Sequence, residues 1–375
     1  MQTQLYFEGI KEGVRWREAP LPRLVEDTDA LVKPIVVARC DFDTQCLFEK
    51  LHLMLRMGLR AGAVDTRVCD HFGAEPFAPP FAVGHEFIAE VAECGEAVTA
   101  FSPGDRVVVP FQVSCGECEP CQSARSGECA GLPPSSLFGF GDRGGRFGGA
   151  LCDLMRIPFA SHMLFRLPKE LSPIALASAG DNLTIAYQGV AHSLKERPDS
   201  RVLVLGGGCA SIALYAIGIA AALGVPSVDY VDIDHDGNGA RRMEVAERLG
   251  ARAAFTLDKF VASGEYDLCV DASSSAAALE RGLSSLARGG VCNCIGMHFG
   301  AAVRLPLFPM YMNGVTLRVG WGNPREDMES LLTWIGRSTF DPGLLNTCRA
   351  DWSEAHRAWL EPGTKVVLVR SGVEG

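Results

Sequence analysis

The chain has 375 residues, which is enough for two domains with separate hydrophobic cores. Its 35 basic and 45 acidic residues give a formal net charge of -10, and no run of lysines and arginines stands out, so nucleic acid is not an expected partner. The N-terminal residues lack the apolar core of a signal peptide, and glycines and a proline break the long uncharged stretch 202–228, so neither a secretory leader nor a membrane span is expected.

Residues 1–165 have the pattern of an antiparallel, partly barrel-like β domain. Short β-rich runs, among them LVKPIVVARC, FIAEVAECG and DRVVVPF, alternate with glycine and proline turns. Cys40 ends the first of these runs. The sequence predicts that the residues after it, DFDTQC, continue the strand into a turn.

Four cysteines stand close together within residues 110–132. They are Cys115, Cys118, Cys121 and Cys129, in a C-x2-C-x2-C-x7-C spacing. We expect a cytoplasmic protein, in which cysteines stay reduced, so disulfides are disfavoured. An iron–sulfur cluster would place its fourth cysteine closer, with a proline after it, and chance clustering is the remaining alternative. Four thiolates fill the tetrahedron that zinc prefers, which predicts a structural zinc without an open position for chemistry.

From about residue 200 the pattern changes to alternating strands and helices. Strand patterns cover residues 201–206, 227–234, 266–273 and 291–297, and helix patterns cover 210–224, 240–251 and 275–290. Strands and helices that alternate with short links predict a doubly wound parallel sheet covered on both faces. After about residue 318 the chain returns to mixed structure and is expected to rejoin the first domain.

A glycine-rich turn separates the first strand and helix of this second domain. Glycines at such a turn let the backbone approach a pyrophosphate, which then lies at the helix N-terminus. The residues Gly206, Gly207 and Gly208 open the turn, and the G-x-G-x-x-G pattern ends on Ser211 in place of its last glycine. Alternatively, the turn is two residues longer and Ala213 takes the close-packing position.

A carboxylate at the end of the next strand strengthens the dinucleotide hypothesis. Asp232 stands 26 residues after Gly206, near the usual distance for the acid that binds the ribose 2′-hydroxyl. Asp234 is an alternative, or else the N-cap of the following helix. A carboxylate there would repel a 2′-phosphate, so NAD is favoured over NADP, although Arg241 and Arg242 leave NADP open.

Several of these features together resemble the zinc-dependent medium-chain alcohol dehydrogenases over nearly the whole chain. They are the early Cys40, the GHE motif in AVGHEFIAEV, the turn in SPGDRV, the four-cysteine lobe and the central nucleotide-binding pattern. The resemblance implies a mixed α/β protein with a GroES-like catalytic domain, residues 1–182 and 319–375, and a Rossmann domain, residues 183–318. It also implies a homodimer or homotetramer.

The resemblance implies a second, catalytic zinc in addition to the structural one, and so two zinc ions per chain. Its ligands would be Cys40, His85 and Asp181, which leave one position for water or a substrate oxygen. Glu86 would be the carboxylate next to the ion, and Asp43 would orient the ligand imidazole.

A basic residue near the C-terminus also matches the family. Lys365 corresponds to a position that meets the cofactor pyrophosphate, and its alternative is an ordinary surface lysine.

The chain departs from the family where a hydroxyl normally passes the substrate proton to a histidine. Phe42 and Gln45 occupy these positions, and neither relays a proton in that manner. Thr44 is close by, but an adjacent strand position would point to the other face. Asp41 is a replacement candidate, with a solvated turn aspartate as its alternative.

A second departure is the long stretch between Cys40 and His85. Leu51, Met54, Leu55 and Leu59 follow helical spacing. We expect the 47–75 segment to form a lid or substrate-pocket helix, a packing helix or a subunit contact.

Together, the residues and the resemblance predict a zinc-dependent NAD(H) oxidoreductase that interconverts a small-molecule alcohol and its aldehyde or ketone. The missing relay hydroxyl leaves open a reductase of a C=N or conjugated C=C bond. A catalytically silent NAD-binding protein is a further alternative, against which the presence of Cys40, His85 and Asp181 argues.

Overall fold

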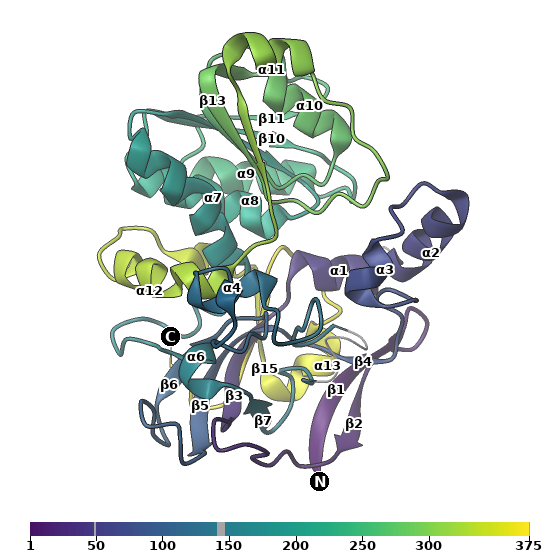
Figure 1. Ribbon diagram of the computed structural model, residues 1–375, viewed down its shortest axis with the longest axis vertical. Helices are drawn as coiled ribbons and strands as arrows, with labels where there is room; N and C mark the ends of the chain where they lie inside the picture. Colours follow the sequence, from purple (N-terminus) through teal and green to yellow (C-terminus); the bar gives the residue numbers. More distant parts are fainter. Residues whose placement is uncertain (49, 141–146, 375) are drawn as a thin grey trace. The chain divides into compact units, whose positions relative to one another are not determined.

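The computed structural model describes residues 1–48, 50–140 and 147–374 and separates into two compact units (Figure 1). The first unit comprises residues 1–184, 323–336 and 346–375, and the second comprises residues 185–322 and 337–345. In the part of the chain that the structure describes, no helix is long and apolar enough to cross a membrane.

The first unit is built on two β-sheets. The larger sheet has the order β15-β16-β3-β5-β6-β8, with β7 paired to β3, and every pair except β15 with β16 is antiparallel. The smaller sheet, β2-β1-β4, is antiparallel throughout. The strands are β1 (Gln2–Gly9), β2 (Gly13–Ala19), β3 (Ala30–Ala38), β4 (Phe81–Ala82), β5 (Glu86–Cys94), β6 (Arg106–Val109), β7 (Met155–Ile157), β8 (Phe165–Arg166), β15 (Cys348–Asp351) and β16 (Val366–Val369).

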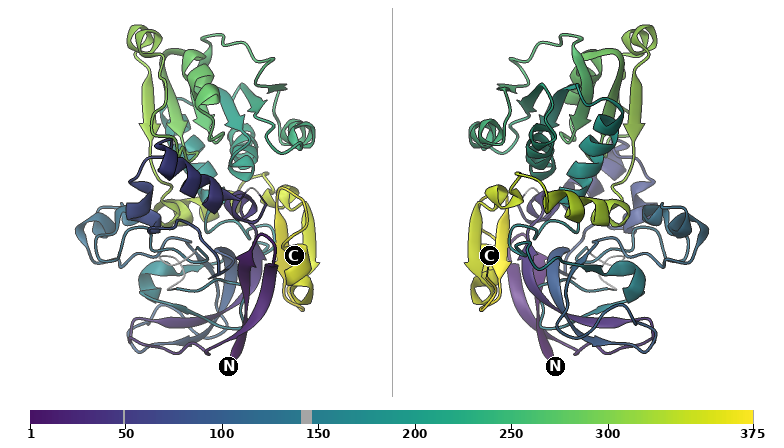
Figure 2. Two further views of the ribbon diagram at one scale, coloured as in Figure 1. Left: turned by 90° about the vertical axis from the view of Figure 1, so that its right-hand side faces the viewer. Right: turned by 90° about the vertical axis from the view of Figure 1, so that its left-hand side faces the viewer.

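The three β-rich runs of the sequence are β3, β5 and β6, which confirms the antiparallel β domain. The last strands of the chain return to this unit because β16 pairs with β3, so that yellow and purple ribbons lie side by side in Figure 2. The helices of the unit are short apart from α2 and α12. They are α1 (Asp41–Leu47), α2 (Leu51–Ala61), α3 (Val68–Phe72), α4 (Glu119–Gln122), α6 (Ala160–Met163), α12 (Pro324–Ile335) and α13 (Ala355–Ala358).

The second unit is a parallel sheet with the strand order β11-β10-β9-β12-β13-β14. All neighbouring strands in it run parallel, which confirms the predicted Rossmann architecture. Its elements are α7 (Asn182–Glu196, which begins in the first unit), β9 (Arg201–Gly206), α8 (Ala210–Ala222), β10 (Ser227–Asp232), α9 (Gly239–Arg248), β11 (Ala253–Thr256), β12 (Tyr266–Asp271), α10 (Ala276–Ser284), β13 (Leu286–Cys294), α11 (Leu307–Asn313) and β14 (Thr316–Val319).

Helices cover both faces of this sheet. On one face, Leu203 and Cys269 belong to the same buried cluster as Leu279 of α10. On the other, Asn293 Nδ2 of β13 donates to the backbone oxygen of Gly189 in α7. Strands of a sheet that helices cover on both faces bury successive side chains, which explains the continuous apolar runs in the sequence.

One predicted helix is too long. The sequence pattern placed it at 275–290, but α10 ends at Ser284 and β13 begins at Leu286. The hydroxyls of Ser284 and Ser285 bond to backbone oxygens four residues earlier, an alternative to continuing the helix. Pairing of Leu286 with Tyr266 of β12 then favours the strand.

Candidate active site and metal centres

Cys40 lies at the N-terminus of helix α1, so the predicted strand and turn after it are wrong. Its Sγ accepts a hydrogen bond from the Phe42 backbone N–H at 3.4 Å, and the Asp43 carboxylate accepts one from the Cys40 backbone N–H at 3.0 Å. This reciprocal capping starts the helix and fixes the sulfur at its first turn. Thr44 Oγ1 lies 3.3 Å from the Cys40 backbone oxygen, as helical geometry dictates, and not on the opposite face of a strand.

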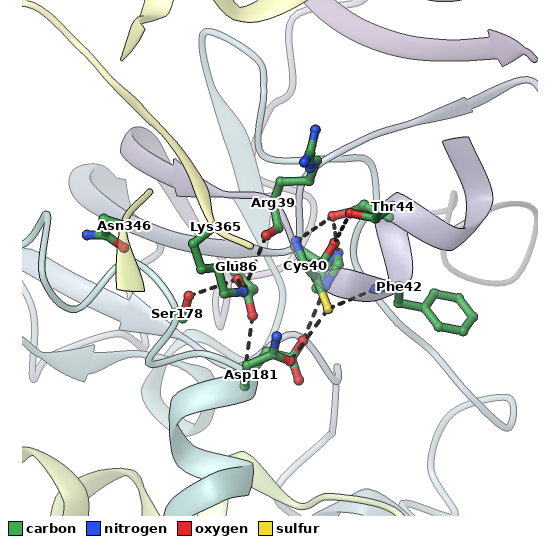
Figure 3. Close-up of polar contacts among 12 residues, drawn as sticks. Arg39, Cys40, Phe42, Thr44, Glu86, Ser178, Asp181, Asn346 and Lys365 are labelled. Carbon is green, nitrogen blue, oxygen red and sulfur yellow. Dashed lines mark hydrogen bonds and ion pairs between the residues drawn. The ribbon is translucent and has the colours of Figure 1, made fainter. Parts of the chain in front are cut away.

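The predicted catalytic ligands come together in the first unit. Cys40 caps α1, His85 precedes β5, and Asp181 precedes α7. One ligand atom from each lies within 4.8 Å of the other two, and all three residues are buried. Figure 3 shows the Cys40 sulfur directed toward Asp181.

The His85 imidazole supplies the test of whether a metal ion fits. It is fully buried, and neither ring nitrogen has a hydrogen-bond partner among the described residues. Nε2 lies 3.3 Å from Asp181 Oδ2, and Nδ1 lies 3.7 Å from Asp43 Oδ2. Because unsatisfied buried polar atoms are costly, a cation at Nε2 fits this arrangement. Cys, His and Asp are zinc ligands, and three of them leave one coordination position open.

When no cation is present, the electrostatics of the cluster favour the protonated forms of Cys40 and His85. Burial raises the pKa of the Cys40 thiol well above its usual range, and the Asp181 carboxylate adds to this effect. Burial lowers the pKa of His85, but the Asp43 and Asp181 carboxylates outweigh it and raise that pKa overall. A divalent cation would take the place of these protons on the ligands.

Glu86 and Lys365 form a fully buried ion pair beside the three ligands. Lys365 Nζ lies 2.5 Å from Glu86 Oε2 and 3.3 Å from the Arg39 backbone oxygen. The Ser178 hydroxyl donates to the same carboxylate at 3.0 Å. Burial raises the pKa of Glu86 to about 7, against the opposing effect of Lys365. The alternative of a surface lysine is therefore wrong, and contact of Lys365 with a pyrophosphate stays a prediction.

An aromatic cluster borders the ligands, and the sequence patterns did not reveal it. The Phe42 ring centroid lies 4.8 Å from that of Phe77 and 5.3 Å from that of Phe140. The Phe140 ring in turn lies 4.2 Å from the His85 ring. In Figure 3 the Phe42 ring extends away from the Cys40 sulfur. An apolar surface thus occupies the position where the family has a hydroxyl. In the sequence, the only indication of this apolar surface was Phe42 at the position of the family's hydroxyl.

The inserted segment contains the predicted helix. It is α2, on which Leu51 and Leu55 are buried while Met54 and Met57 are exposed. Residue 49 of the 47–75 segment lies outside the described residues. The ring of Phe72, at the end of α3, lies 4.6 Å from that of Phe77, so the insert contributes to the aromatic cluster. Its role as a lid or pocket helix stays a prediction.

The four-cysteine lobe has the geometry of a tetrahedral thiolate site. The Sγ–Sγ distances are 3.4 Å for Cys118 and Cys121, 3.6 Å for Cys115 and Cys129, and 3.9 Å for Cys118 and Cys129. Zinc–sulfur bonds of about 2.3 Å place the sulfurs of a tetrahedron about 3.8 Å apart, far beyond the length of a disulfide. The backbone N–H of Cys121 lowers the pKa of Cys118 to about 6, toward the thiolate that a metal requires.

The glycine turn links β9 to α8. Gly207 has a φ of +128°, and a Cβ there would lie 2.6 Å from the Ile233 backbone oxygen. A Cβ on Gly206 would lie 2.9 Å from the Cβ of Ala213, the residue of the longer alternative pattern. Ser211 is buried in α8. The backbone of these two glycines thus lies too close to Ile233 and to helix α8 for a side chain to fit.

Asp232 ends β10 but is already bonded to other side chains. Its Oδ2 accepts from Arg242 Nε at 2.8 Å and from the Tyr230 hydroxyl at 2.5 Å. Arg242 also bonds to Asp236 at 2.7 Å. Asp234 is more exposed, with 40% of its side chain accessible, and accepts from the Gly237 N–H at 2.8 Å. Asp234 is not the N-cap of the next helix, because α9 begins after Asn238.

Comparisons with known proteins agree with this geometry. Residues 26–169 match the model of the alcohol dehydrogenase GroES-like domain, and residues 211–337 match that of zinc-binding dehydrogenases. The medium chain reductase/dehydrogenase ucsI of Acremonium sp is 32% identical over 237 residues, which cover 62% of this chain and 69% of the relative. The chain belongs to the zinc-binding medium-chain alcohol dehydrogenase family.

Two further relatives match over a longer span. The uncharacterized zinc-type alcohol dehydrogenase-like protein AdhB of Bacillus subtilis (strain 168) is 23% identical over 368 residues, 90% of each chain. The structure of the alcohol dehydrogenase TADH from Thermus sp. ATN1 superposes with a TM-score of 0.81 at 26% identity, covering 98% of this chain and 99% of that one. The protein is thus a zinc-type, alcohol dehydrogenase-like oxidoreductase.

Because four thiolates would complete the tetrahedral shell of a zinc ion, Cys121→Ser should remove about one zinc per chain. We expect the free energy of unfolding to fall by about 4 kcal/mol, in the range of lost metal sites. Metal analysis by mass spectrometry and denaturant unfolding measure the two effects. Cys348→Ser is the matched control, since Cys348 belongs to no metal-ligating group within the described chain. Full zinc content in Cys121→Ser would contradict the assignment.

Proposed function

We propose that the chain is a zinc- and NAD(H)-dependent dehydrogenase that interconverts an alcohol and an aldehyde or ketone. The observation that carries the proposal is the buried group of Cys40, His85 and Asp181, with two imidazole nitrogens that lack hydrogen-bond partners in the described chain. Zinc held there would supply a Lewis acid for the substrate oxygen, and NAD would accept or donate the hydride.

The neighbouring side chains would prepare the ligands for this chemistry. Asp43 lies on the Nδ1 side of His85, where it favours the tautomer with the proton on Nδ1 and the lone pair on Nε2. The Glu86 carboxylate is held by Lys365 and Ser178, so its charge is balanced beside the ligands. These residues would orient the ligands and balance charge without touching the substrate carbon.

The aromatic cluster supports a substrate with an apolar part. The Phe140 ring stands beside His85, Phe42 packs against both Phe140 and Phe77, and none of the three rings has a polar hydrogen to donate. Apolar and aromatic groups gain free energy on contact with such rings. We infer that an aryl or branched alkyl alcohol or aldehyde is favoured over a short polar one.

The same cluster favours one second candidate function. With Phe42 and Gln45 in place of the relay residues, the site has no hydroxyl–imidazole pair at those positions for the substrate proton. Reduction of a C=N or conjugated C=C bond would place the proton on a different atom. Such a reductase would use the same hydride donor.

For the cofactor, the carboxylates after β10 support NAD. Arg242 is almost fully buried and is paired with Asp232 and Asp236, which raise its pKa against the effect of burial. Its charge is therefore neutralised. Asp234 and Asp236 leave partly exposed carboxylates nearby, and these would repel a 2′-phosphate.

The main proposal is tested by assaying the protein against alcohols, aldehydes, imines and enals with NAD(H) and NADP(H). We expect NADH-linked reduction of aldehydes or ketones, and His85→Ala should lose about one zinc and at least ~100-fold in kcat/KM, since Lewis-acid stabilisation amounts to several kcal/mol. His356→Ala, at a partly buried histidine outside every metal-ligating group in the described chain, is the control. Turnover of imines or enals alone would establish the second candidate instead.

The role of the aromatic cluster is tested by Phe42→Ser and its control Phe42→Leu. Loss of the ring should lower kcat/KM for aryl aldehydes by about 10-fold or more, relative to acetaldehyde, because about 1.5–3 kcal/mol of apolar contact is removed. Phe42→Leu keeps an apolar surface and should retain most of that preference. Equal effects of both variants on all aldehydes would contradict a contact with the substrate.

Cofactor preference is tested by Asp234→Asn. Removing this carboxylate should raise the affinity for NADP about 10-fold relative to NAD, a change of ~1.4 kcal/mol. Dissociation constants measured by fluorescence titration with NADH and NADPH give the ratio. Asp258→Asn, at an exposed aspartate after β11, should leave the ratio unchanged. An unchanged ratio in Asp234→Asn would remove this residue from cofactor selection.

A further inference from the structure

A third group of metal-ligating side chains lies in the second unit, at the carboxyl edge of the parallel sheet. Asp271 ends β12, Cys294 ends β13, and His298 follows β13 by four residues. Asp271 and Cys294 are direct neighbours in the register of the two strands. Parallel strands end at the same edge of a sheet, which explains why residues 23 positions apart meet here.

The three side chains converge on one point. Asp271 Oδ2 lies 3.3 Å from Cys294 Sγ and 3.1 Å from His298 Nε2. One ligand atom from each lies within 4.8 Å of the other two. Around zinc, bonds of about 2.0 Å to nitrogen or oxygen and 2.3 Å to sulfur place ligand atoms about 3.3–3.5 Å apart. The two distances to Asp271 are close to these values.

The surrounding contacts prepare the carboxylate for a cation. Asp271 Oδ1 accepts hydrogen bonds from the Ser273 N–H at 3.0 Å and from the Ser273 hydroxyl at 2.5 Å. The Asp271 backbone oxygen accepts from the N–H groups of Ile295 and Gly296. Oδ1 and the backbone are therefore fixed, and Oδ2 faces the sulfur and the imidazole. Outer hydrogen bonds that orient a ligand are typical of metal sites.

We propose that Asp271, Cys294 and His298 bind a third zinc ion in each chain. The donor set is the same as that of Cys40, His85 and Asp181, namely one thiolate, one imidazole and one carboxylate, and it suits a divalent ion of intermediate softness. Asp271 and Cys294 are buried, while His298 keeps 14% of its side chain accessible, which leaves a path for the ion.

Occupation of this site would connect β12 and β13 to the segment that follows β13. His298 lies in that segment, before α11, and the ion would attach it to the ends of both strands. Without the ion, the Cys294 thiol donates a hydrogen bond to Asp271 Oδ2 at 3.3 Å. Binding would therefore release this proton to solvent. The inference concerns metal binding alone and does not depend on the proposed dehydrogenase reaction.

The experiment is a titration of the purified two-zinc protein with Co²⁺, followed by the thiolate-to-cobalt charge-transfer absorption and by metal analysis. The wild-type chain should take up one additional equivalent with a thiolate band. His298→Gln should weaken this uptake at least tenfold, and Cys294→Ser should abolish the band. His298→Gln changes a partly exposed side chain, so it remains informative if Cys294→Ser fails to fold.

Two controls separate this site from the others. Cys348→Ser should titrate like the wild type, and His85→Ala should keep the third equivalent while losing the metal proposed for catalysis. A wild-type chain without a third equivalent would overturn the inference, as would a third equivalent that persists with its band in both His298→Gln and Cys294→Ser. Either result would assign the three side chains to a hydrogen-bond network only, and would leave the dehydrogenase assays unaffected.

Discussion

The first unit depends on charge balance within one buried group of ionisable side chains. When ionised, its thiol and carboxylates carry four negative charges, and its ammonium and guanidinium carry two positive ones. A divalent cation would supply the two positive charges that are missing. An uncompensated buried charge costs several kcal/mol. The pKa values of Cys40 and Glu86 are therefore raised, which indicates that the group requires more positive charge to stay ionised. The members are Arg39, Cys40, Asp43, Glu86, Asp181 and Lys365, around the imidazole of His85, which would be neutral as a metal ligand.

The fold assembles this group from distant parts of the chain. Strand β16 pairs with β3, and the Arg39 N–H donates to the Val366 backbone oxygen at 2.8 Å. This pairing places Lys365 next to residues that precede it by more than 300 positions. Glu86 stands at the start of β5, which pairs with β3 on the other side. The C-terminal segment thus completes the ligand environment, because Lys365, which directly precedes β16, supplies the positive charge for Glu86.

Much of this could be predicted from the sequence, and the failures have physical causes. The strands, the sheet type and the cysteine lobe were predictable because each follows from the periodicity or the residue spacing within a continuous segment of the chain. Helix α1 was missed because a thiol serves as its N-cap, a role that usually belongs to Ser, Thr, Asp or Asn. The aromatic cluster was missed because Phe42, Phe77 and Phe140 meet only through tertiary packing. Asp232 matched a spacing rule, but its pairing with Arg242 depends on a side chain ten residues later that spacing alone does not reveal.

The three groups of candidate metal ligands differ in what their side chains do without an ion, and we expect this difference to order their affinities. In the four-cysteine lobe, backbone N–H groups already point at the sulfurs and lower the pKa of Cys118 to about 6, whereas burial raises the pKa of Cys121 and Cys129. At His85, both ring nitrogens lack partners in the described chain, so the ion-free state carries an unsatisfied buried imidazole. At His298, Nε2 already lies 3.1 Å from the Asp271 carboxylate. An ion at either group must displace a thiol proton, from Cys294 or from Cys40. At the third group it must also replace the contact between His298 and Asp271, whereas at His85 it satisfies ring nitrogens that have no hydrogen-bond partner in the described chain. The ligand types are the same at both groups, so we expect the free energy of the ion-free state, and not the donor set, to make the group of Cys40, His85 and Asp181 the stronger of these two candidate metal sites.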